Sequence, residues 1–256
     1  MIPTNYLING HHRYHHLKVP LRREFWDIPL MYAKMIEPLT TEEGREELQK
    51  LCDKVGVDSS WVLDHDFQRE LRWCSKANKS VGGRQVLSLW DSHNNNVLVR
   101  KEPDVHGHRA TLIDYETSCW SWRGHDIGNY WNFWLFDVAQ HENNFQSKTS
   151  YPSEAVRRKF ITDYLEEVAK VADFELDHNG YDTVDHVLME AEVNGVGALH
   201  FMMMAVMDAR VEGHTFNEAQ VAKPWVHRAK TDIELYKVRK QEVIEKYGLD
   251  PDFDDN

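Results

Sequence analysis

The sequence predicts an α+β fold that is mostly helical, with a small β element near the middle of the chain. Apolar residues recur at spacings of three and four in both end regions of the 256-residue chain, a pattern typical of helices. Between these regions lie three short apolar runs separated by polar turns, at residues 85–90, 96–101 and 110–114. There is no internal repeat or low-complexity linker, so we predict a single domain over residues 1–256.

Composition excludes several classes of protein. With 41% apolar and 28% charged residues the chain is typical of a globular protein, and its net charge of −12 argues against nonspecific binding to nucleic acid. No apolar run is long enough for a membrane span, and the N-terminus has no signal-peptide core. The three cysteines form no CxxC pair, which favours a reducing compartment, and we expect the cytoplasm.

The helical regions divide into segments with recognisable ends. Thr40 and Thr41 precede two glutamates, a pattern typical of a helix start, and Gly248 is typical of a position just beyond a helix end. Pro224 suits a first helical turn, and Gly195 or Gly197 would break the preceding helix. The expected helices cover residues 42–55, 59–75, 153–172, 182–211 and 224–247.

The polar residues around the short strands are those that a kinase requires. Asp91 is followed five residues later by Asn96, the D-x-x-x-x-N spacing of kinase catalytic loops, and Asp114 ends an apolar strand. An Asp can accept the proton of an attacking hydroxyl, while an Asn and a second Asp hold Mg²⁺. Glu116 could reach a second metal ion or a water molecule. The spacing alone is a weak signal, since Asp and Asn also favour ordinary turns.

These segments resemble the signature region of the choline/ethanolamine kinase family. The family carries H-N-D-x-x-x-x-N-I-L, then I-D-[FY]-E, then Y-x-x-R-G-x-D-I-G-N. Residues 89–98 of this chain read LWDSHNNNVL, residues 113–116 read IDYE, and residues 122–129 read WRGHDIGN. The triplets Ile-Pro-Thr at residues 2–4 and Leu-His-Phe at residues 199–201 extend the likeness over nearly the whole chain.

The resemblance implies the C-terminal lobe of a protein-kinase-like fold, with its catalytic core in residues 85–136 and an interlobe segment in residues 1–23. It implies phosphoryl transfer from ATP to the hydroxyl of a small amino alcohol, in phospholipid head-group synthesis, and pairing as a homo- or heterodimer. Asp91 would be the catalytic base, with Asn96 and Asp114 as Mg²⁺ ligands and Glu116 as a secondary one. The expected structural supports beneath the site are Arg123, Asp126 and Asn129, with Arg123 and Asp126 forming a buried ion pair.

The sequence also departs from the family pattern. No Gly-rich phosphate loop or phosphate-binding Lys is recognisable, so we expect the N-terminal ATP-binding lobe to be absent and name no ATP-binding residue. Leu89 and Trp90 replace the His-Asn that precedes the catalytic Asp. The expected substrate pocket has Met203 and Val206 at the family's two Trp positions and Trp225 at its last aromatic position. Because aromatic faces bind quaternary ammonium groups, the acceptor could be another amine or alcohol.

Other interpretations stay open. A chain without the ATP-binding lobe could be a pseudokinase-like partner or ligand-binding protein, and the apolar surface left exposed would favour oligomers. The histidines at positions 11, 12, 15 and 16 could bind a metal, although a polar helix face explains them as well, since no acidic or Cys ligand is nearby.

Overall fold

The computed structural model describes residues 25–104, 109–170 and 175–253. Within the chain, contacts define two compact units. Of the described residues, the first unit comprises 25–26, 80–104, 109–133, 151–170 and 175–195, and the second unit comprises 27–79, 134–150 and 196–253. The expected interlobe segment and the four N-terminal histidines lie outside the described residues.

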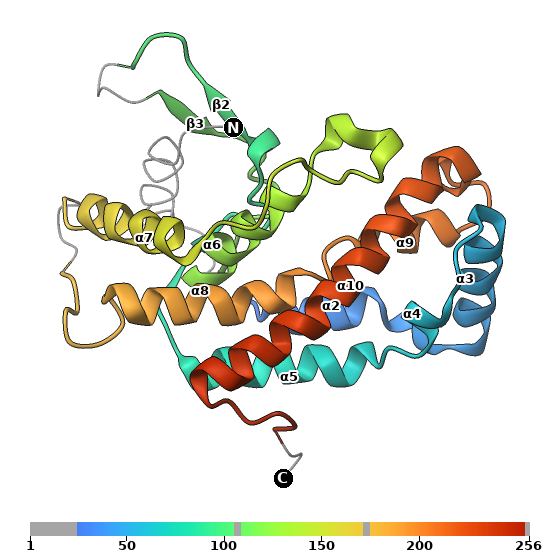
Figure 1. Ribbon diagram of the computed structural model, residues 1–256, viewed down its shortest axis with the longest axis horizontal. Coiled ribbons are helices and arrows are strands. Elements are labelled where there is room, and N and C mark those ends of the chain that lie inside the picture. Colours follow the sequence, from blue (N-terminus) through green and yellow to red (C-terminus); the bar gives the residue numbers. More distant parts are fainter. Residues whose placement is uncertain (1–24, 105–108, 171–174, 254–256) are drawn as a thin grey trace. The chain divides into compact units, whose positions relative to one another are not determined.

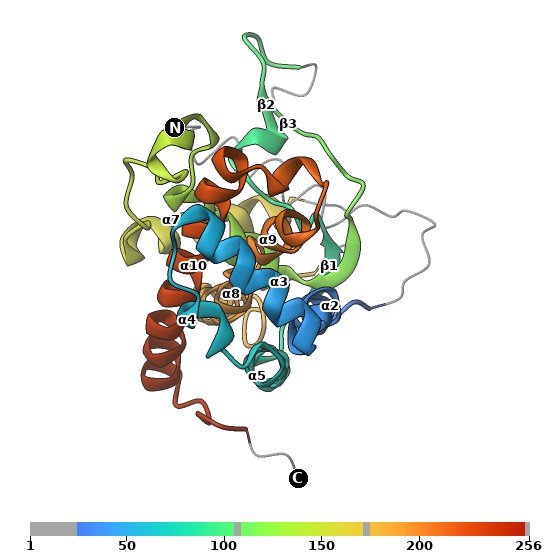
Figure 2. The same cartoon turned by 90° about the vertical axis from the view of Figure 1, so that its right-hand side faces the viewer.

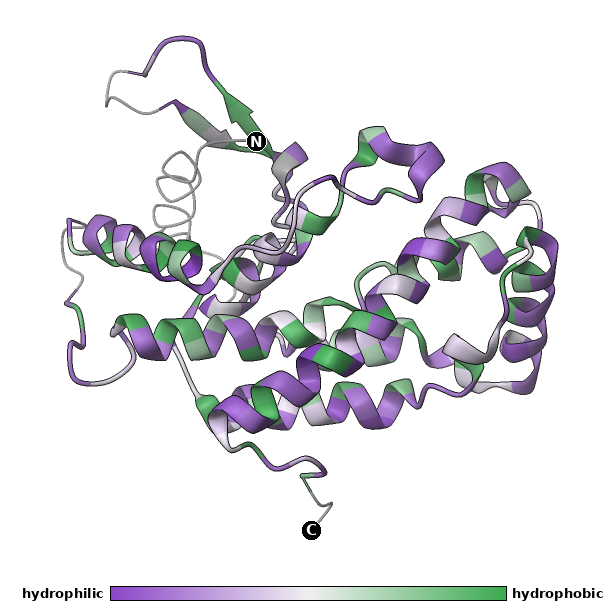
Figure 3. Ribbon diagram, viewed as in Figure 1, coloured by the Kyte–Doolittle hydropathy of each residue, from purple (hydrophilic) through white to green (hydrophobic). Residues whose placement is uncertain are grey.

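The first unit contains two small antiparallel sheets. Strand β1 (Gln85–Ser88) pairs with β4 (Cys119–Trp122), with Gln85 opposite Trp122 and Ser88 opposite Cys119. Strand β2 (Val97–Val99) pairs with β3 (Ala110–Leu112), with Val97 opposite Leu112. The β2–β3 ribbon extends away from the helices of its own unit in both views (Figures 1 and 2). Its strand β2 is coloured hydrophobic in Figure 3, although Leu98 and Val99 are exposed.

The core of the first unit is built around helix α6 (Arg123–Asn132), in which every residue is buried. Helix α7 (Glu154–Val168) contributes Phe160, whose ring stacks at 6.1 Å on Tyr130 of α6. Helix α8 (Val184–Ala198) approaches α6 so closely that Gly128 and Gly195 face each other without side chains between them. Small residues at this crossing therefore allow the two backbones to touch.

The second unit is helical. Its α-helices are α2 (Ile28–Met35), α3 (Glu42–Val55), α4 (Ser60–Leu63), α5 (Phe67–Val81), α9 (Met203–Arg210) and α10 (Ala219–Tyr247). Short 3₁₀ helices of the chain are η1 (Glu37–Thr40), η2 (Asn94–Asn96), η3 (Phe133–Leu135), η4 (Val138–Asn143) and η5 (Thr215–Asn217). None of the helices in the described part of the chain is long and apolar enough to cross a membrane.

Partly buried polar contacts connect α5 with α10 in the second unit. The Tyr236 hydroxyl donates to Glu70 Oε2 at 2.5 Å, and Lys240 Nζ donates to the same oxygen at 2.7 Å. Between α4 and α5, His65 turns inward and its Nε2 lies 3.2 Å from Nε2 of His200. These contacts pair charged and polar side chains from segments that lie far apart in the sequence.

The predicted helix over residues 42–55 is confirmed, with Thr41 accepting a hydrogen bond from Gly44 N and Gly56 in the left-handed conformation at its end. The prediction of one helix over residues 59–75 is wrong. The chain forms α4 and α5 instead, because the Asp66 side chain accepts from Arg69 N and starts a new helix. Helix α5 then continues to Val81.

Three further boundaries differ from the prediction. Strand β4 was not expected, since Cys-Trp-Ser-Trp lacks a clear alternation of apolar and polar residues. The helix expected over residues 182–211 is interrupted after Ala198 and not at a glycine, because Gly195 packs against α6 within a continuous helix. Helix α10 begins at Ala219, ahead of Pro224, with Val221 N and Ala222 N bonded to the Glu218 carbonyl.

Candidate active site

Asp91 and Asn96 meet in the loop that follows β1. Asn96 Nδ2 donates to the Asp91 carbonyl at 3.0 Å and lies 3.4 Å from Asp91 Oδ2. Asn96 Oδ1 makes no hydrogen bond among the described residues, so its carbonyl oxygen is available. Asp91 Oδ1 is buried without a hydrogen-bond partner in that same part of the chain, although His93 Nε2 lies 3.4 Å away. The loop therefore contains two oxygen atoms without a hydrogen bond from the described residues, of which Asp91 Oδ1 is buried.

The backbone before Asp91 adopts an uncommon conformation. Trp90 has φ = 64°, in the left-handed region that a bulky residue rarely occupies. Such a conformation costs about 1–2 kcal/mol for an L-residue and persists where the surroundings impose it. Here the Trp90 amide donates to Asp126 Oδ1 at 3.0 Å, and the Trp90 carbonyl accepts from Asn129 Nδ2 at 3.1 Å. Both ends of the residue are held by α6, which orients Asp91.

Asp126 lies in the first turn of α6 and binds the loop with both carboxylate oxygens. Ser88 Oγ donates to Oδ1 at 2.8 Å, and the Leu89 amide donates to Oδ2 at 2.7 Å. The Asp126 carbonyl also accepts from Ser92 Oγ at 2.8 Å. A fully buried carboxylate needs such donors, and here they come from the segment that carries Asp91.

Asp114 follows β3, and a backbone hydrogen bond made by the residue before it brings it close to Asn96. The Ile113 amide donates to the Asn96 carbonyl at 3.0 Å, which extends the β2–β3 ladder to the residue before Asp114. Asp114 also has φ = 64°. The side chains of Asp114 and Glu116 are exposed and make no ion pair or hydrogen bond to another described residue. Thr117 Oγ1 donates to the Leu89 carbonyl at 3.0 Å and joins this segment to the Asp91 loop.

The ion pair suggested between Arg123 and Asp126 is wrong. Arg123 instead forms buried pairs with Asp182 Oδ1 at 2.8 Å and Glu190 Oε2 at 2.8 Å, while Glu190 Oε1 accepts from the Gly124 amide. Burial would raise the pKa of Asp182, but hydrogen bonds from Arg84 and Arg123 outweigh it and lower the pKa to about 2. Arg123 thus anchors the start of α6, while Asp126 binds the loop.

Sequence reasoning missed the partners of this loop. Ser88, Ser92 and Thr117 are polar residues without a motif, and Asp182 and Glu190 lie 59 and 67 residues from Arg123. His125 is also buried beneath the loop; burial lowers the pKa of this histidine to about 4, so its ring is neutral near pH 7.

The residues expected in the substrate pocket lie in the second unit. Met203 and Val206 are 1% and 0% exposed and belong to the core. Trp225 is partly exposed and lies in a cluster of aromatic rings, with ring centroids 4.4 Å from Phe145 and 6.3 Å from Phe136. Of these three, Trp225 alone has exposed surface that could meet a ligand.

The residues at the end of the Asp91 loop fit Mg²⁺. Among the described residues no three His, Cys, Asp or Glu side chains are close enough together to hold a metal ion. Mg²⁺ does not need such a cage, since it usually binds one or two carboxylates together with water and substrate phosphates. The available carbonyl oxygen of Asn96 and the exposed carboxylate of Asp114 suit this mode of binding.

Comparison with known proteins connects this geometry to a family. The family model described as choline/ethanolamine kinase matches residues 7–227. A choline/ethanolamine kinase from Mus musculus is 37% identical over 133 residues, covering 51% of this chain and 34% of the relative. Choline kinase alpha from Mus musculus is 22% identical over 216 residues, covering 82% of this chain and 46% of the relative. The matched region thus spans between a third and a half of these curated relatives.

Solved structures share the fold. A choline kinase from Cryptosporidium parvum superimposes with a TM-score of 0.61 at 18% identity, covering 96% of this chain and 66% of that structure. An ethanolamine kinase from Plasmodium vivax gives a TM-score of 0.56 at 14% identity, covering 92% and 60% respectively. The chain therefore has the protein-kinase-like fold that the sequence predicted, mostly helical with small sheets.

Proposed function

Because the chain belongs to the choline/ethanolamine kinase family, we propose that it transfers the γ-phosphoryl group of ATP to the hydroxyl of a small amino alcohol. The observation that carries the proposal is the hydrogen-bonded pair of Asp91 and Asn96 on a loop held by Asp126. A kinase must hold its base rigidly relative to its metal ligands, since positioning supplies most of the catalysis.

Each residue of the loop has a role in the proposed reaction. Asp91 orients the acceptor hydroxyl and takes its proton as the oxygen attacks phosphorus. Asn96 and Asp114 hold Mg²⁺, and Glu116 holds a second ion or a water molecule. Mg²⁺ supplies positive charge that stabilises the transferring phosphoryl group. Three further residues do not contact the substrate but fix the backbone that carries Asp91. They are Asn129, Asp126 and Arg123.

The proposal extends to the chemical nature of the acceptor. Choline cannot donate a hydrogen bond from its ammonium group and is best held by aromatic faces. Trp225, with Phe136 and Phe145 beside it, supplies such faces. The buried side chains of Met203 and Val206 supply none. We therefore expect a primary amino alcohol such as ethanolamine to be used at least as well as choline. We also propose that the protein pairs with a second family member.

The test is Mg²⁺-dependent transfer of phosphate from ATP to choline and to ethanolamine by the purified chain. Asp91→Asn should lower kcat at least about 1,000-fold, because the base is lost, with a smaller effect on the KM for ATP. Asp163→Asn, which changes a carboxylate on the surface of α7 that pairs with Lys159, is the matched control and should keep full activity.

Loss of turnover in Asp91→Asn alone would support the proposal, and the preferred acceptor would identify the substrate. Turnover that is equal in the natural chain and in Asp91→Asn would refute the assigned base. If neither chain turns over either acceptor while both bind Mg²⁺–ATP, the protein binds the nucleotide without catalysis. Light scattering across a range of concentrations tests the pairing, and a monomer at every concentration would contradict it.

A further inference from the structure

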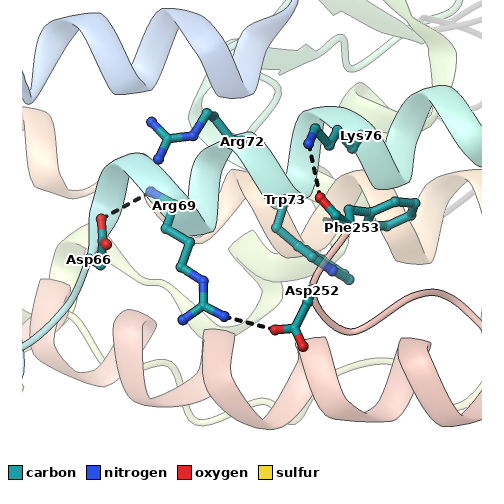
Figure 4. Close-up of a pocket in the computed structure, with 7 residues that line it drawn as sticks. All are labelled: Asp66, Arg69, Arg72, Trp73, Lys76, Asp252 and Phe253. Atoms are coloured by element: carbon teal, nitrogen blue, oxygen red, sulfur yellow. Dashed lines mark hydrogen bonds and ion pairs between the residues drawn. The ribbon is translucent and has the colours of Figure 1, made fainter. Parts of the chain in front are cut away.

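A polar pocket of about 360 Å³ lies in the second unit, on the outer face of α5 (Figure 4). Its lining consists of Asp66, Arg69, Arg72, Trp73, Lys76, Asp252 and Phe253. Residues 69, 72, 73 and 76 follow the i, i+3, i+4, i+7 spacing, so α5 presents three cations and one indole on a single face. This face lies outside the Asp91 loop and has no role in the proposed reaction.

The chain's own C-terminal segment occupies the pocket. Arg69 Nη2 lies 2.8 Å from Asp252 Oδ1, and Lys76 Nζ donates to the Phe253 carbonyl at 2.9 Å. Trp73 Nε1 donates to the Asp250 carbonyl at 2.8 Å. Figure 4 shows Arg69 and Lys76 reaching the segment at two separate points along it. Three side chains of α5 thus bind one carboxylate and two backbone carbonyls.

The segment is folded into a turn that suits these donors. Asp250 accepts from the Asp252 amide at 2.9 Å, and Pro251 lies between them with its φ restricted. Hydrogen bonds from the amides of Asp252 and Phe253 lower the pKa of Asp250, so this carboxyl stays ionised. The turn points the Asp252 carboxylate at Arg69 and carries the Phe253 ring to within 6.1 Å of Trp73.

Trp73 is the centre of the contact. Its side chain is 2% exposed when the segment is present, and Lys240 Nζ of α10 lies 4.6 Å from its ring centroid. Aromatic faces attract cations, and a buried indole N–H needs a hydrogen-bond acceptor. Here Lys240 supplies the cation and the C-terminal segment supplies the acceptor. Removal of the segment would leave the indole N–H without its present partner.

The contacts favour exchange of the segment. The Arg69–Asp252 pair is exposed, with side-chain exposures of 60% and 59%, and exposed pairs contribute little to stability. Two of the three contacts recognise backbone carbonyls, which any peptide carries. Arg72 also lines the pocket, and its side chain makes no hydrogen bond or ion pair to another described residue. Any segment with the same turn, acid and aromatic ring would satisfy these donors.

We propose that this face of α5 is a docking site for an acidic–aromatic peptide segment of a partner protein, and that the C-terminal segment of this chain occupies it as an intramolecular competitor. The ligand is a turn carrying an Asp followed directly by an aromatic residue. Binding depends on Arg69 and Lys76 for charge and on Trp73 for the ring. The inference does not depend on the proposed kinase activity.

The test uses the 256-residue chain and a fluorescent synthetic peptide with the sequence GLDPDFDDN, which is that of residues 248–256. In the natural chain the site is occupied, so the peptide should bind weakly. In the double variant Asp252→Ala, Phe253→Ala, called the released chain, the segment keeps its two backbone contacts but loses the carboxylate and the ring. It should therefore compete less well, and the peptide should bind at least about tenfold more tightly, measured by fluorescence anisotropy. Circular dichroism spectra should be unchanged, since both substitutions lie beyond the last helix.

Matched variants of the released chain locate the site. Adding Arg69→Glu should weaken peptide binding at least about tenfold. Adding Lys50→Glu, an exposed cation on α3 in the same unit, should leave it unchanged. Three results would overturn the proposal. They are no peptide binding to the released chain, equal binding by the natural and released chains, and equal binding of a scrambled peptide of the same composition. The last would reduce the site to nonspecific charge attraction.

Discussion

Asp126 accepts hydrogen bonds from three donors of the Asp91 loop while it is itself part of α6. Ser88 Oγ and the amides of Leu89 and Trp90 all point at its two oxygens. An ionised carboxylate is suited to this, since it has acceptor sites only. An asparagine side chain has the same shape, but its NH₂ group would point at one of these three donors and could not accept a hydrogen bond from it. The charge state and not the size of this side chain therefore holds the loop.

Asp126→Asn should lower the free energy of unfolding by about 2–4 kcal/mol, because at least one buried donor loses its acceptor. Urea denaturation with an unchanged m-value would measure this. Asp163→Asn, which disrupts only the pair with Lys159 on the surface of α7, should cost less than about 0.5 kcal/mol. A loss in Asp126→Asn no larger than in that control would show that the loop is held by other contacts.

The His65–His200 pair is buried in the second unit and has a defined arrangement of protons. His200 Nδ1 lies 3.2 Å from the Gly197 carbonyl and must donate to it. Nε2 of His200 is then an acceptor, so the donor across the 3.2 Å contact is Nε2 of His65. Burial lowers the pKa of His65 to about 4 and that of His200 to about 3. Both rings are neutral in the folded protein near pH 7.

The pair should make stability depend on pH in a definite direction. Each folded pKa lies below the unfolded value of about 6.5, so the unfolded chain takes up protons first as the pH falls. The stability from neutral burial is complete above about pH 6.5 and is lost as the pH falls toward the folded values. Between pH 7.5 and 5, each such histidine should remove about 2 kcal/mol of unfolding free energy.

His200→Gln should therefore be less stable than the natural chain at pH 7.5 but lose about 2 kcal/mol less between pH 7.5 and 5. Urea denaturation at the two pH values provides the measurement. His141→Gln, which changes an exposed histidine of η4, is the control and should keep the pH dependence of the natural chain. Identical pH dependence in both variants would mean that His200 is protonated in the folded state.

The crossing of α6 and α8 depends on the absence of side chains. A Cβ atom added at Gly128 would lie 2.2 Å from the Ala191 carbonyl oxygen and 2.7 Å from Cα of Gly195. Both are backbone atoms, which cannot rotate away as a side chain can. The two helices would have to separate, and with them the loop contacts that α6 makes through Asp126 and Asn129.

Gly128→Ala should destabilise the protein by about 3 kcal/mol or more, because a core cannot absorb the added methyl group without moving a helix. Thermal unfolding would show the change. Gly197→Ala is the matched control, since its nearest neighbours would be at 3.4 Å, an ordinary contact, and alanine is favoured over glycine in helices by about 0.5–1 kcal/mol. We expect that variant to be as stable as the natural chain or slightly more so.

Stability is unevenly distributed in the molecule. Helix α6 is buried throughout, whereas the strands β2 and β3 have three residues each and pair only with one another. Leu98 and Val99 of this ribbon are 53% and 46% exposed. Two-stranded ribbons are marginally stable in water. Asn96 and Asp114, the proposed Mg²⁺ ligands, flank the least protected part of the first unit's β structure.

Amide hydrogen exchange should accordingly be fast in residues 97–99 and 110–112 and slow in α6. Addition of Mg²⁺–ATP should slow exchange in both strands, since a metal held by Asn96 and Asp114 would join the two ends of the ribbon. Mg²⁺ with a nucleotide-free buffer is the control. Unchanged exchange in the strands at saturating Mg²⁺–ATP would contradict the proposed ligands.

Much of the site could be predicted because its residues are near one another in the sequence. Asp91 and Asn96 are five residues apart, so their contact follows from the length of one loop. The starts and ends of helices at Thr41 and Gly248 are likewise local, since a capping residue satisfies backbone groups within one turn. The predicted fold class needs only the order of helical and extended segments, and it was correct.

The sequence by itself thus determined the helical and extended regions, the motif and the family. The tertiary structure decided which charged and hydrogen-bonding groups pair with one another. Arg123 could have paired with Asp126 three residues away, but it pairs with Asp182 and Glu190, which packing of α8 brings to it. Gly195 could have broken a helix, but it is retained where α6 must approach. A buried polar group takes the partner that packing places within reach, and distance along the chain does not specify that partner.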